Sequence, residues 1–357
     1  MNHSTCCEGK NTSTVFDFDR YISKNNRDFL AGLYAIISLV TIFGNSFVLI
    51  SIYKFKQFQT NLFLLLANLA ISDLLVGLLV IPYEVVFYSF LIHQTDSDLY
   101  KYACLIRYTL GPIFLGASVW SLWCISVERY FAVIYPLKHL RLCTKNRLIA
   151  LILTLWVIAI TIGILPILGW NNWQPETTEC YFKVIWTKSY LFILCVIYSS
   201  SLLSSIMMYI RVIYVTLLYI KRIKARFQSD GKHTRMSRNF TKTKIAIFIH
   251  GIFAICWTPF FVFMFCEAVF LKRTREVVVI NFIVRSFGIF NTSINWIIFS
   301  LKNNLFQTSF RACQKARNTT PPCTGKLQSA ASVVTSGRCR LQLKFDRYLN
   351  RNNKLDV

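Results

Sequence analysis

The sequence LFLLLANLAISDLLVGLLVIPYEVVFYSFL, residues 62–91, indicates the fold class more strongly than any other stretch of this chain. It contains two acidic residues, Asp73 and Glu84, and no basic ones. A helix needs roughly 20 mostly apolar residues to cross a bilayer. Because the apolar residues run continuously and do not alternate, this stretch predicts a membrane-spanning α-helix and not a barrel strand.

Apolar runs of this kind recur along the chain. Each one reaches the length that a spanning helix requires, and a helix satisfies its own backbone groups inside lipid. The predicted spans cover residues 29–53, 62–91, 102–135, 148–168, 189–220, 245–271 and 277–301. The predicted fold class is therefore all-α, a seven-transmembrane helix bundle.

The composition of the 357 residues combines 54% hydrophobic residues with a formal net charge of +24. Only 16% of the residues are charged, so the basic residues must be gathered between long uncharged runs. This combination excludes disorder over most of the chain and argues against a soluble enzyme. Nucleic acid is not an expected partner, because the basic segments carry neither an aromatic stacking motif nor a recognition helix.

The basic residues fall on one side of the predicted spans. That side holds 26 Lys and Arg and only three acidic residues, in segments 54–60, 136–147, 221–244 and 302–357. Loops rich in Lys and Arg stay in the cytoplasm, so the N-terminus is expected outside. The first 28 residues lack the apolar core of a cleavable signal peptide and carry glycosylation triplets at Asn2 and Asn11. We expect a multi-pass plasma-membrane protein.

Polar side chains interrupt the predicted spans at a few positions. Asp73 lies in the middle of the second span, and Glu128 and Arg129 lie near the inner end of the third. Charged groups are costly inside a bilayer, so those that are present are functional candidates. Asn291 and Asn295 are four residues apart and therefore share one helix face.

Short motifs occupy fixed places on the predicted helices. They are Gly44-Asn45 with Val48, Asn68-Leu69-Ala70-Ile71-Ser72-Asp73, Glu128-Arg129-Tyr130 followed by Pro136-Leu137, Trp156, Tyr209, Phe253 with Cys256-Trp257-Thr258-Pro259, and Phe306 with Phe310. In this order they resemble the rhodopsin-like (class A) G protein-coupled receptors over about residues 29–313. The resemblance implies an extracellular tail (1–28), a receptor domain (29–301), an amphipathic surface helix (302–313) and a cytoplasmic tail (314–357).

The resemblance implies that a ligand activates the chain by moving its sixth helix. Pro259 removes a backbone hydrogen bond and kinks this helix, so that its inner end can swing outward. Glu128 holds Arg129 in the resting state, and Arg129 meets the G protein after the movement. The residues expected in this switch are Glu128, Arg129, Tyr130, Tyr209, Phe253, Trp257, Pro259, Asn295 and Phe299.

The seventh predicted helix departs from the family pattern at two positions. Trp296 replaces a proline, which restores a backbone donor and should straighten the helix. Phe299 replaces a tyrosine, so the hydroxyl that contacts Tyr209 through water in the family is missing. The sixth helix also has Asn239 near the place of an acidic residue that could lock Arg129. A missing lock favours basal activity, whereas a missing hydroxyl weakens the active state.

An ion site is also implied by the resemblance. Asp73, Ser118, Asn291 and Asn295, with Trp257 beside them, match positions that surround a sodium ion in many members of the family. Oxygen ligands with one buried carboxylate suit a hard monovalent cation. The alternative is an Asp73 that is protonated or bonded to water, with no ion. Apart from this ion, no cofactor is expected.

The sequence contains twelve cysteines. The resemblance implies a disulfide between Cys104, at the start of the third predicted helix, and Cys180, in the loop before the fifth. Cys313 and Cys323 are candidates for palmitoylation. The sequence has no zinc-ligand spacing, glycine-rich phosphate loop or Ser/His/Asp set, so the chain is not expected to be an enzyme.

The expected ligand pocket has an apolar, aromatic floor and charges near its outer end. The residues expected to form it are Glu84, Arg107, Gly111, Leu115, Phe182, Trp257, Phe260, Phe261, Met264 and Arg285. This lining suits a small organic ligand of modest polarity. Arg285 could bind a carboxylate or a phosphate, or it could instead pair with Glu84 across the second and seventh helices.

Single positions discriminate among the ligands that the family binds. Gly111 replaces the aspartate that binds cationic amines, and Ile289 replaces the lysine that binds retinal. Leu168-Gly169-Trp170-Asn171-Asn172 and Cys180-Tyr181-Phe182 are similar to adenosine receptors, in which the aromatic residue stacks on adenine. Met264, however, stands where those receptors carry an asparagine that binds the base, so adenosine is an alternative and not the favoured ligand.

Together these patterns predict a receptor that couples a small extracellular ligand to heterotrimeric G proteins. The alternative, motivated by the changes in the seventh helix, is a non-signalling relative that acts as a scavenger or heterodimer partner. Arrestin, receptor kinases and anionic membrane lipid are further expected partners. Leu355-Asp356-Val357 could add a strand to a PDZ domain, or could belong to a free polar tail.

Overall fold

The computed structural model describes residues 24–55, 58–89, 97–174, 180–226, 234–270 and 275–302, with most of their side chains. Several predicted features lie outside this part of the chain. They are the glycosylation triplets at Asn2 and Asn11, the surface helix (302–313) apart from its first residue, Cys313, Cys323, and the tail (314–357).

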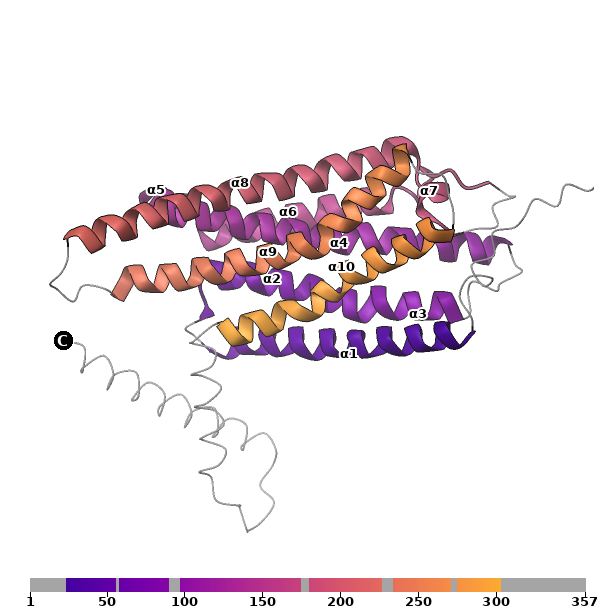
Figure 1. Ribbon diagram of the computed structural model, residues 1–357, viewed down its shortest axis with the longest axis horizontal. Coiled ribbons are helices and arrows are strands. Elements are labelled where there is room, and N and C mark those ends of the chain that lie inside the picture. The colour runs from indigo at the N-terminus through magenta and orange to yellow at the C-terminus, as the bar shows by residue number, and fades with distance from the viewer. Residues whose placement is uncertain are drawn as a thin grey trace, which may run out of the picture. The chain divides into compact units, whose positions relative to one another are not determined.

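The described residues are almost entirely helical (Figure 1). The elements are α1 (Lys24–Lys54), α2 (Asn61–Leu75), the π-helical turn η3 (Val76–Val80), α3 (Ile81–Ser89), α4 (Ser97–Ile134), α5 (Pro136–Leu142), α6 (Lys145–Ile164), α7 (Phe182–Ile185), α8 (Lys188–Arg226), α9 (Thr234–Val269) and α10 (Arg275–Lys302). The long helix α4 is central, because it packs against α2, α6, α8 and α9.

Each of the seven predicted spans coincides with a helix, the second being built from α2, η3 and α3 in succession. Counted over the described residues, six helices are long and apolar enough to cross a membrane. The helix α10 occupies the seventh predicted span, and its described stretch carries several buried polar residues. The all-helical fold class predicted from hydropathy is confirmed.

Some helix ends differ from the ends of the apolar runs. The helix α6 stops at Ile164, four residues before the predicted end, because Pro166 cannot donate a helical hydrogen bond and disfavours helix before it. In contrast, α8 continues to Arg226 and α9 begins at Thr234, both beyond the apolar runs. The apolar run indicates only the part of a helix that lies in lipid. The helical backbone hydrogen bonds of α8 and α9 continue beyond that part.

The turn η3 changes the direction in which the following residues point. Its five residues adopt a π-helical turn directly before α3, whose second residue, Pro82, has no backbone N–H to donate. A π turn holds more residues than an α-helical turn and therefore shifts the faces of the residues that follow it, and such turns often occur near functional sites. It therefore sets the face on which Glu84, one turn further along, enters the bundle.

Buried amides connect the helices. Asn68 of α2 donates to Ser121 Oγ of α4 at 2.6 Å and accepts from Trp156 Nε1 of α6 at 2.9 Å. Asn45 of α1 donates to the carbonyl of Thr292 in α10 at 3.2 Å. Interhelical hydrogen bonds of this kind stabilise helix packing in membranes, where lipid supplies no competing partner.

Gly44 of α1 lies directly against the Trp296 side chain of α10. A Cβ atom built at Gly44 would overlap the indole ring, so this glycine is what admits a tryptophan in place of the family's proline. The helix α10 continues through Trp296 to Lys302 without interruption. This agrees with the expectation that restoring the backbone donor leaves the helix uninterrupted.

Gly44→Ala is expected to destabilise the chain by about 1–3 kcal/mol, because overpacking forces the indole or the helix to shift. The thermal unfolding of the purified chain in detergent measures this effect. Gly32→Ala in the same helix is the control, since nothing lies within 4 Å of a Cβ there. In a Trp296→Ala background the cost should disappear. Equal losses at the two glycines would contradict the account.

Candidate ligand and coupling sites

A pocket of about 1020 Å³, part of it open to solvent, lies among η3, α4, α7, α8, α9 and α10. It is lined by every residue predicted to contact the ligand except Glu84, which lies behind the lining. These lining residues are Arg107, Gly111, Leu115, Phe182, Trp257, Phe260, Phe261, Met264 and Arg285. The structure thus brings together residues separated by almost 180 positions in the sequence.

The floor of the pocket is aromatic. The Trp257 ring lies 5.6 Å from that of Phe260 and 6.1 Å from that of Phe261, measured between ring centroids. On its other side, Gly288 of α10 lets the indole approach the helix, since a Cβ there would lie 2.8 Å from the ring. The Trp257 indole, carried by α9, therefore packs directly against α10 at Gly288.

Several lining residues were not selected from the sequence. Tyr198 of α8 donates to the carbonyl of Pro112 at 2.8 Å, and Gly116 leaves room for its hydroxyl group. Trp186, directly after α7, packs edge-on against Tyr108 with ring centroids 5.5 Å apart. An aromatic residue in an apolar helix carries no sequence signal for the direction in which it points, so these residues could not be distinguished from ordinary packing.

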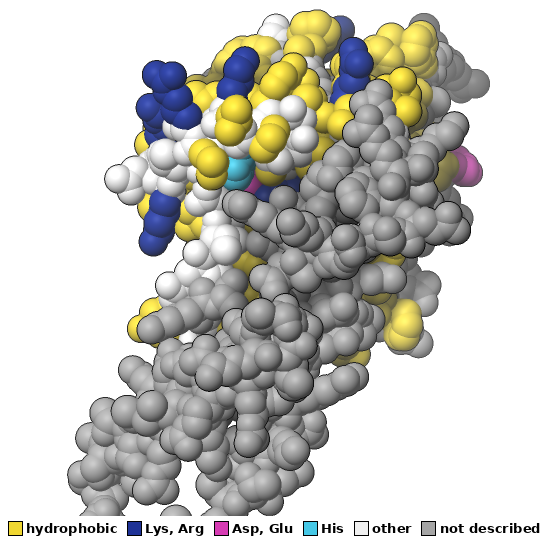
Figure 2. Space-filling view, turned by 90° about the vertical axis from the view of Figure 1, so that its left-hand side faces the viewer, with side chains coloured by type: hydrophobic (Ala, Val, Ile, Leu, Met, Phe, Trp, Pro, Cys, Tyr) yellow, Lys and Arg dark blue, Asp and Glu magenta, His cyan; other side chains and the backbone are white. Residues whose placement is uncertain are grey.

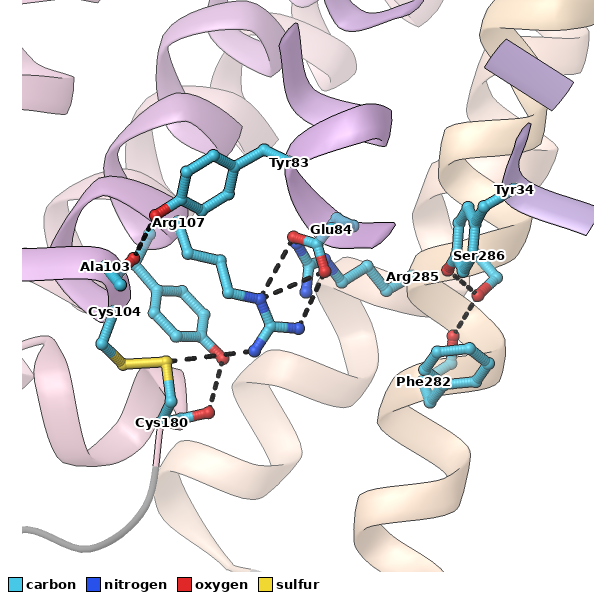
Figure 3. Close-up of polar contacts among 11 residues, drawn as sticks. Tyr34, Tyr83, Glu84, Ala103, Cys104, Arg107, Cys180, Phe282, Arg285 and Ser286 are labelled. Atoms are coloured by element: carbon cyan, nitrogen blue, oxygen red, sulfur yellow. Dashed lines mark hydrogen bonds and ion pairs between the residues drawn. A yellow bond between two sulfur atoms is a disulfide. The ribbon is translucent and has the colours of Figure 1, made fainter. Parts of the chain in front are cut away.

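Three charged side chains meet beside the pocket (Figure 3). Arg107 donates to Glu84 Oε2 through Nη2 at 2.8 Å and through Nε at 3.1 Å. Arg285 donates to Glu84 Oε1, so one carboxylate binds two guanidinium groups. The Glu84–Arg285 pair that was one of two sequence interpretations is thus present, and Arg107 joins it. Both Glu84 and Arg107 are at most 4% exposed.

A disulfide fixes the loop that covers this end of the bundle. It joins Cys104 of α4 to Cys180, directly before Tyr181 and α7, with 5.6 Å between the Cα atoms. Tyr108 adds a hydrogen bond of 3.4 Å to the Cys180 carbonyl. Phe182, the first residue of α7, is thereby placed on the pocket and packs against Trp186. The disulfide predicted by resemblance is present.

The residues around Asp73 form a polar centre. Its Oδ2 accepts from Asn295 Nδ2 at 2.9 Å, and its Oδ1 lies 3.5 Å from Ser118 Oγ. A cavity of about 260 Å³, partly open, is bordered by Asp73, Asn45, Asn295 and other residues of α1, α2, α9 and α10. The structure brings three of the four predicted ion ligands together.

Asn291, the fourth predicted ion ligand, lines the main pocket, as Ser118 also does. Within the described residues, neither its Oδ1 nor the Oδ1 of Asn295 has a hydrogen-bond partner. Buried oxygen atoms without partners are costly, and a cation or water would satisfy them. No cluster of three or more His, Cys, Asp or Glu side chains suited to a metal occurs in the described part of the chain.

The opposite end of the bundle, where α5 lies, carries the predicted coupling motif. Arg129 donates through Nε and Nη2 to the neighbouring Glu128 carboxylate, and both residues are buried. His139 of α5 also contacts Glu128, with 2.9 Å between Nε2 and Oε1. His139 was not predicted from the sequence, because no local pattern shows that α5 brings it against Glu128 of α4.

Basic side chains surround this end of the bundle. Figure 2 looks onto it and shows Lys and Arg side chains around its visible part. The exposed basic residues of α1, α5 and α6 here are Lys54, Lys138, Arg141, Lys145 and Arg147. Tyr130 lies in the same region and packs edge-on against Tyr135, with ring centroids 6.0 Å apart.

Aromatic contacts along α9 extend from the pocket floor toward this end. Phe253 lies one turn from Trp257 on α9, with ring centroids 6.1 Å apart. One turn further, His250 packs against Tyr209 of α8 at 5.2 Å. Pro259 interrupts the backbone ladder inside α9, and the helix changes direction in this region (Figure 1). The side chains of Phe299 and Asn239 lie outside the described residues.

This arrangement is that of a seven-helix receptor, and comparison of the sequence with known families agrees. The chain belongs to the seven-transmembrane receptors of the rhodopsin family, whose pattern matches residues 44–299, well over half of the chain. It is accordingly a multi-pass membrane protein and a receptor, not an enzyme.

Among individual proteins, the chain is 30% identical to adenosine receptor A2b of Homo sapiens over 248 residues, which cover 64% of this chain and 71% of that receptor. It is 25% identical to lysophosphatidic acid receptor 1 of Homo sapiens over 310 residues, covering 85% of this chain and 81% of that receptor. It is also 28% identical to 5-hydroxytryptamine receptor 4 of Rattus norvegicus over 346 residues, covering 86% and 82%.

Proposed function

We propose that the chain is a plasma-membrane G protein-coupled receptor with its N-terminus outside. A small extracellular ligand binds in the pocket, and outward movement of α9 at the α5 end activates heterotrimeric G proteins. The ligand is adenosine-like or another small organic or anionic compound. The relatives named above are called receptors for three different compounds, adenosine, lysophosphatidic acid and 5-hydroxytryptamine.

The observation that carries this proposal is that one helix borders both sites. Trp257 of α9 forms the pocket floor, whereas His250 of the same helix contacts Tyr209 two turns closer to the buried Glu128–Arg129 pair. A ligand that binds one position of Trp257 better than another therefore biases the position of α9. Pro259, half a turn from Trp257, supplies the hinge.

Nucleotide exchange tests the proposal. The purified chain in lipid nanodiscs is mixed with G proteins and exposed to adenosine, biogenic amines and small carboxylates in turn. One class should accelerate exchange, and Trp257→Ala should remove the stimulated part. Trp170→Ala is the control, because Trp170 packs on Tyr190 away from the pocket. Ligand binding or uptake that leaves exchange unchanged would instead support a scavenger or heterodimer partner.

Phe299→Tyr is expected to raise agonist-stimulated signalling, because it restores the hydroxyl that the family uses to stabilise the active state. Second-messenger production at equal surface expression measures this effect. Phe290→Tyr is the matched control, because Phe290 lies on the same helix and is exposed. An unchanged or lower response with Phe299→Tyr would refute the prediction.

We also propose that Asp73, Ser118, Asn295 and Asn291 hold a sodium ion that favours the resting state. The unpartnered oxygen atoms of Asn291 and Asn295 and the cavity beside Asp73 fit a hard cation. Sodium should then lower agonist affinity in the wild type and have no effect in Asp73→Asn. Equal agonist affinity with and without sodium in both proteins would refute the ion site.

Further partners are proposed on the basis of charge and family. Anionic lipid suits the exposed basic residues at the α5 end. Arrestin, receptor kinases and a PDZ protein are proposed for the cytoplasmic side, where the tail segment lies outside the described residues.

A further inference from the structure

We propose that the ligand is an organic anion whose carboxylate or phosphate binds between Arg107 and Arg285 while its apolar body rests on the Trp257 floor. The inference rests on the proposed function only in taking the pocket as the ligand site. It adds the chemical class of the ligand and its orientation.

The charged side chains at the pocket wall are positive. Among the lining residues whose side chains the structure describes, the charged ones are Arg107 and Arg285, and none is an aspartate or a glutamate. Glu84 binds both arginines and is not among the residues that line the cavity. A ligand in the pocket therefore meets guanidinium groups first, which attract an anion and disfavour a cationic amine.

Both arginines are held by Glu84 before a ligand arrives. Arg107 is bound through two nitrogens to Glu84, and its guanidinium lies 4.6 Å from the centroid of the Phe87 ring. Guanidinium groups present planar forks of N–H donors that match carboxylate and phosphate oxygens. Fixing these forks lowers the entropy cost of binding.

The rest of the pocket lining is mainly apolar, in contrast to the two arginines. Beyond the arginines, the walls are formed mainly by aromatic and aliphatic side chains, among them Tyr108, Phe182, Leu115 and Ile289. Asn281 adds one amide near the arginines, where it donates to Tyr181 at 3.4 Å. One anionic group followed by an uncharged apolar body is the ligand that fits both regions.

Thermal unfolding of the purified full-length chain tests this inference directly. The probes are 4-phenylbutyrate and 4-phenylbutyl phosphate, with 4-phenylbutanamide and 4-phenylbutanol as neutral counterparts. At least one anion should raise Tm saturably, at a concentration ten-fold or more below that of its neutral counterpart. Comparison of the two anions then identifies the group that the arginines prefer.

Single substitutions test whether the anions raise Tm by binding to the two arginines. Arg285→Gln and Arg107→Gln should each raise the half-saturating concentration of the anion ten-fold or more, without changing the response to the neutral probes. Arg285→Lys should retain most of the binding, which keeps the test valid if a neutral variant folds poorly. Arg147→Gln is the control, because Arg147 is exposed on α6 at the opposite end.

Three results would overturn the inference: no anion shifts Tm, the neutral probes bind as tightly as the anions, or the arginine variants bind the anions unchanged. Because this measurement uses no G protein, it is separate from the proposed signalling. An anion that binds through Arg107 and Arg285 but does not accelerate nucleotide exchange would uphold this inference and count against the proposed function.

Discussion

Glu84→Gln is expected to lower the free energy of unfolding by about 3 kcal/mol, because removing one partner of a buried ion pair leaves uncompensated charge. Glu84 is 3% exposed and accepts hydrogen bonds from both Arg107 and Arg285. Its loss places the buried guanidinium group of Arg107 and the partly buried one of Arg285 beside a neutral amide. The expected signs are a lower Tm of the purified chain and less protein at the cell surface.

A matched control and a partial rescue make this prediction specific. Asp28→Asn removes an acidic residue that is exposed near the start of α1, and it should leave Tm nearly unchanged. Adding Arg285→Gln to Glu84→Gln removes one of the two cations and should recover part of the loss. If Glu84→Gln were as stable as Asp28→Asn, the three-residue cluster would not stabilise the bundle.

Glu128→Gln should raise basal nucleotide exchange about 5–30-fold, the change that corresponds to 1–2 kcal/mol of differential stabilisation. The buried Arg129 is bound to Glu128 through two nitrogens in this structure. Loss of the carboxylate weakens that contact and frees Arg129 for the G protein. Exchange without ligand, normalised to surface expression, measures the shift.

The neighbouring helix α5 supplies graded variants. His139→Ala removes a contact of 2.9 Å to Glu128 and should raise basal exchange less than Glu128→Gln does. Lys138→Gln alters an exposed residue next to it and should have no effect. Basal exchange that stays at the wild-type level in Glu128→Gln would show that this ion pair does not hold the resting state.

The fold was predictable because lipid imposes a simple rule on sequence. Apolar length alone located the helices, whereas their ends depended on local features such as Pro166 and on polar turns that extend into water. The disulfide between Cys104 and Cys180 came from the family resemblance and is present. Hydropathy contained no sign of the π turn η3, which sets the face of Glu84.

The candidate site was predictable at positions that match motifs of the family. Trp257 and Phe261 line the pocket as expected, and Asp73 meets Asn295. Sequence reasoning missed Tyr198, because nothing in an apolar helix shows which aromatic residue faces inward. It also treated Arg285 as either a ligand group or a partner of Glu84. In the structure Arg285 binds Glu84 and lines the pocket as well.

The central claim is that a ligand in the pocket moves the α5 end of α9 outward. Spin labels carried by unnatural amino acids at Lys244 of α9 and Arg147 of α6, both exposed, report this movement. With G protein present, the compound that stimulates exchange should lengthen the distance between the labels by several ångströms, and Trp257→Ala should abolish the change. A distance that stays unchanged while the pocket is filled would contradict the account.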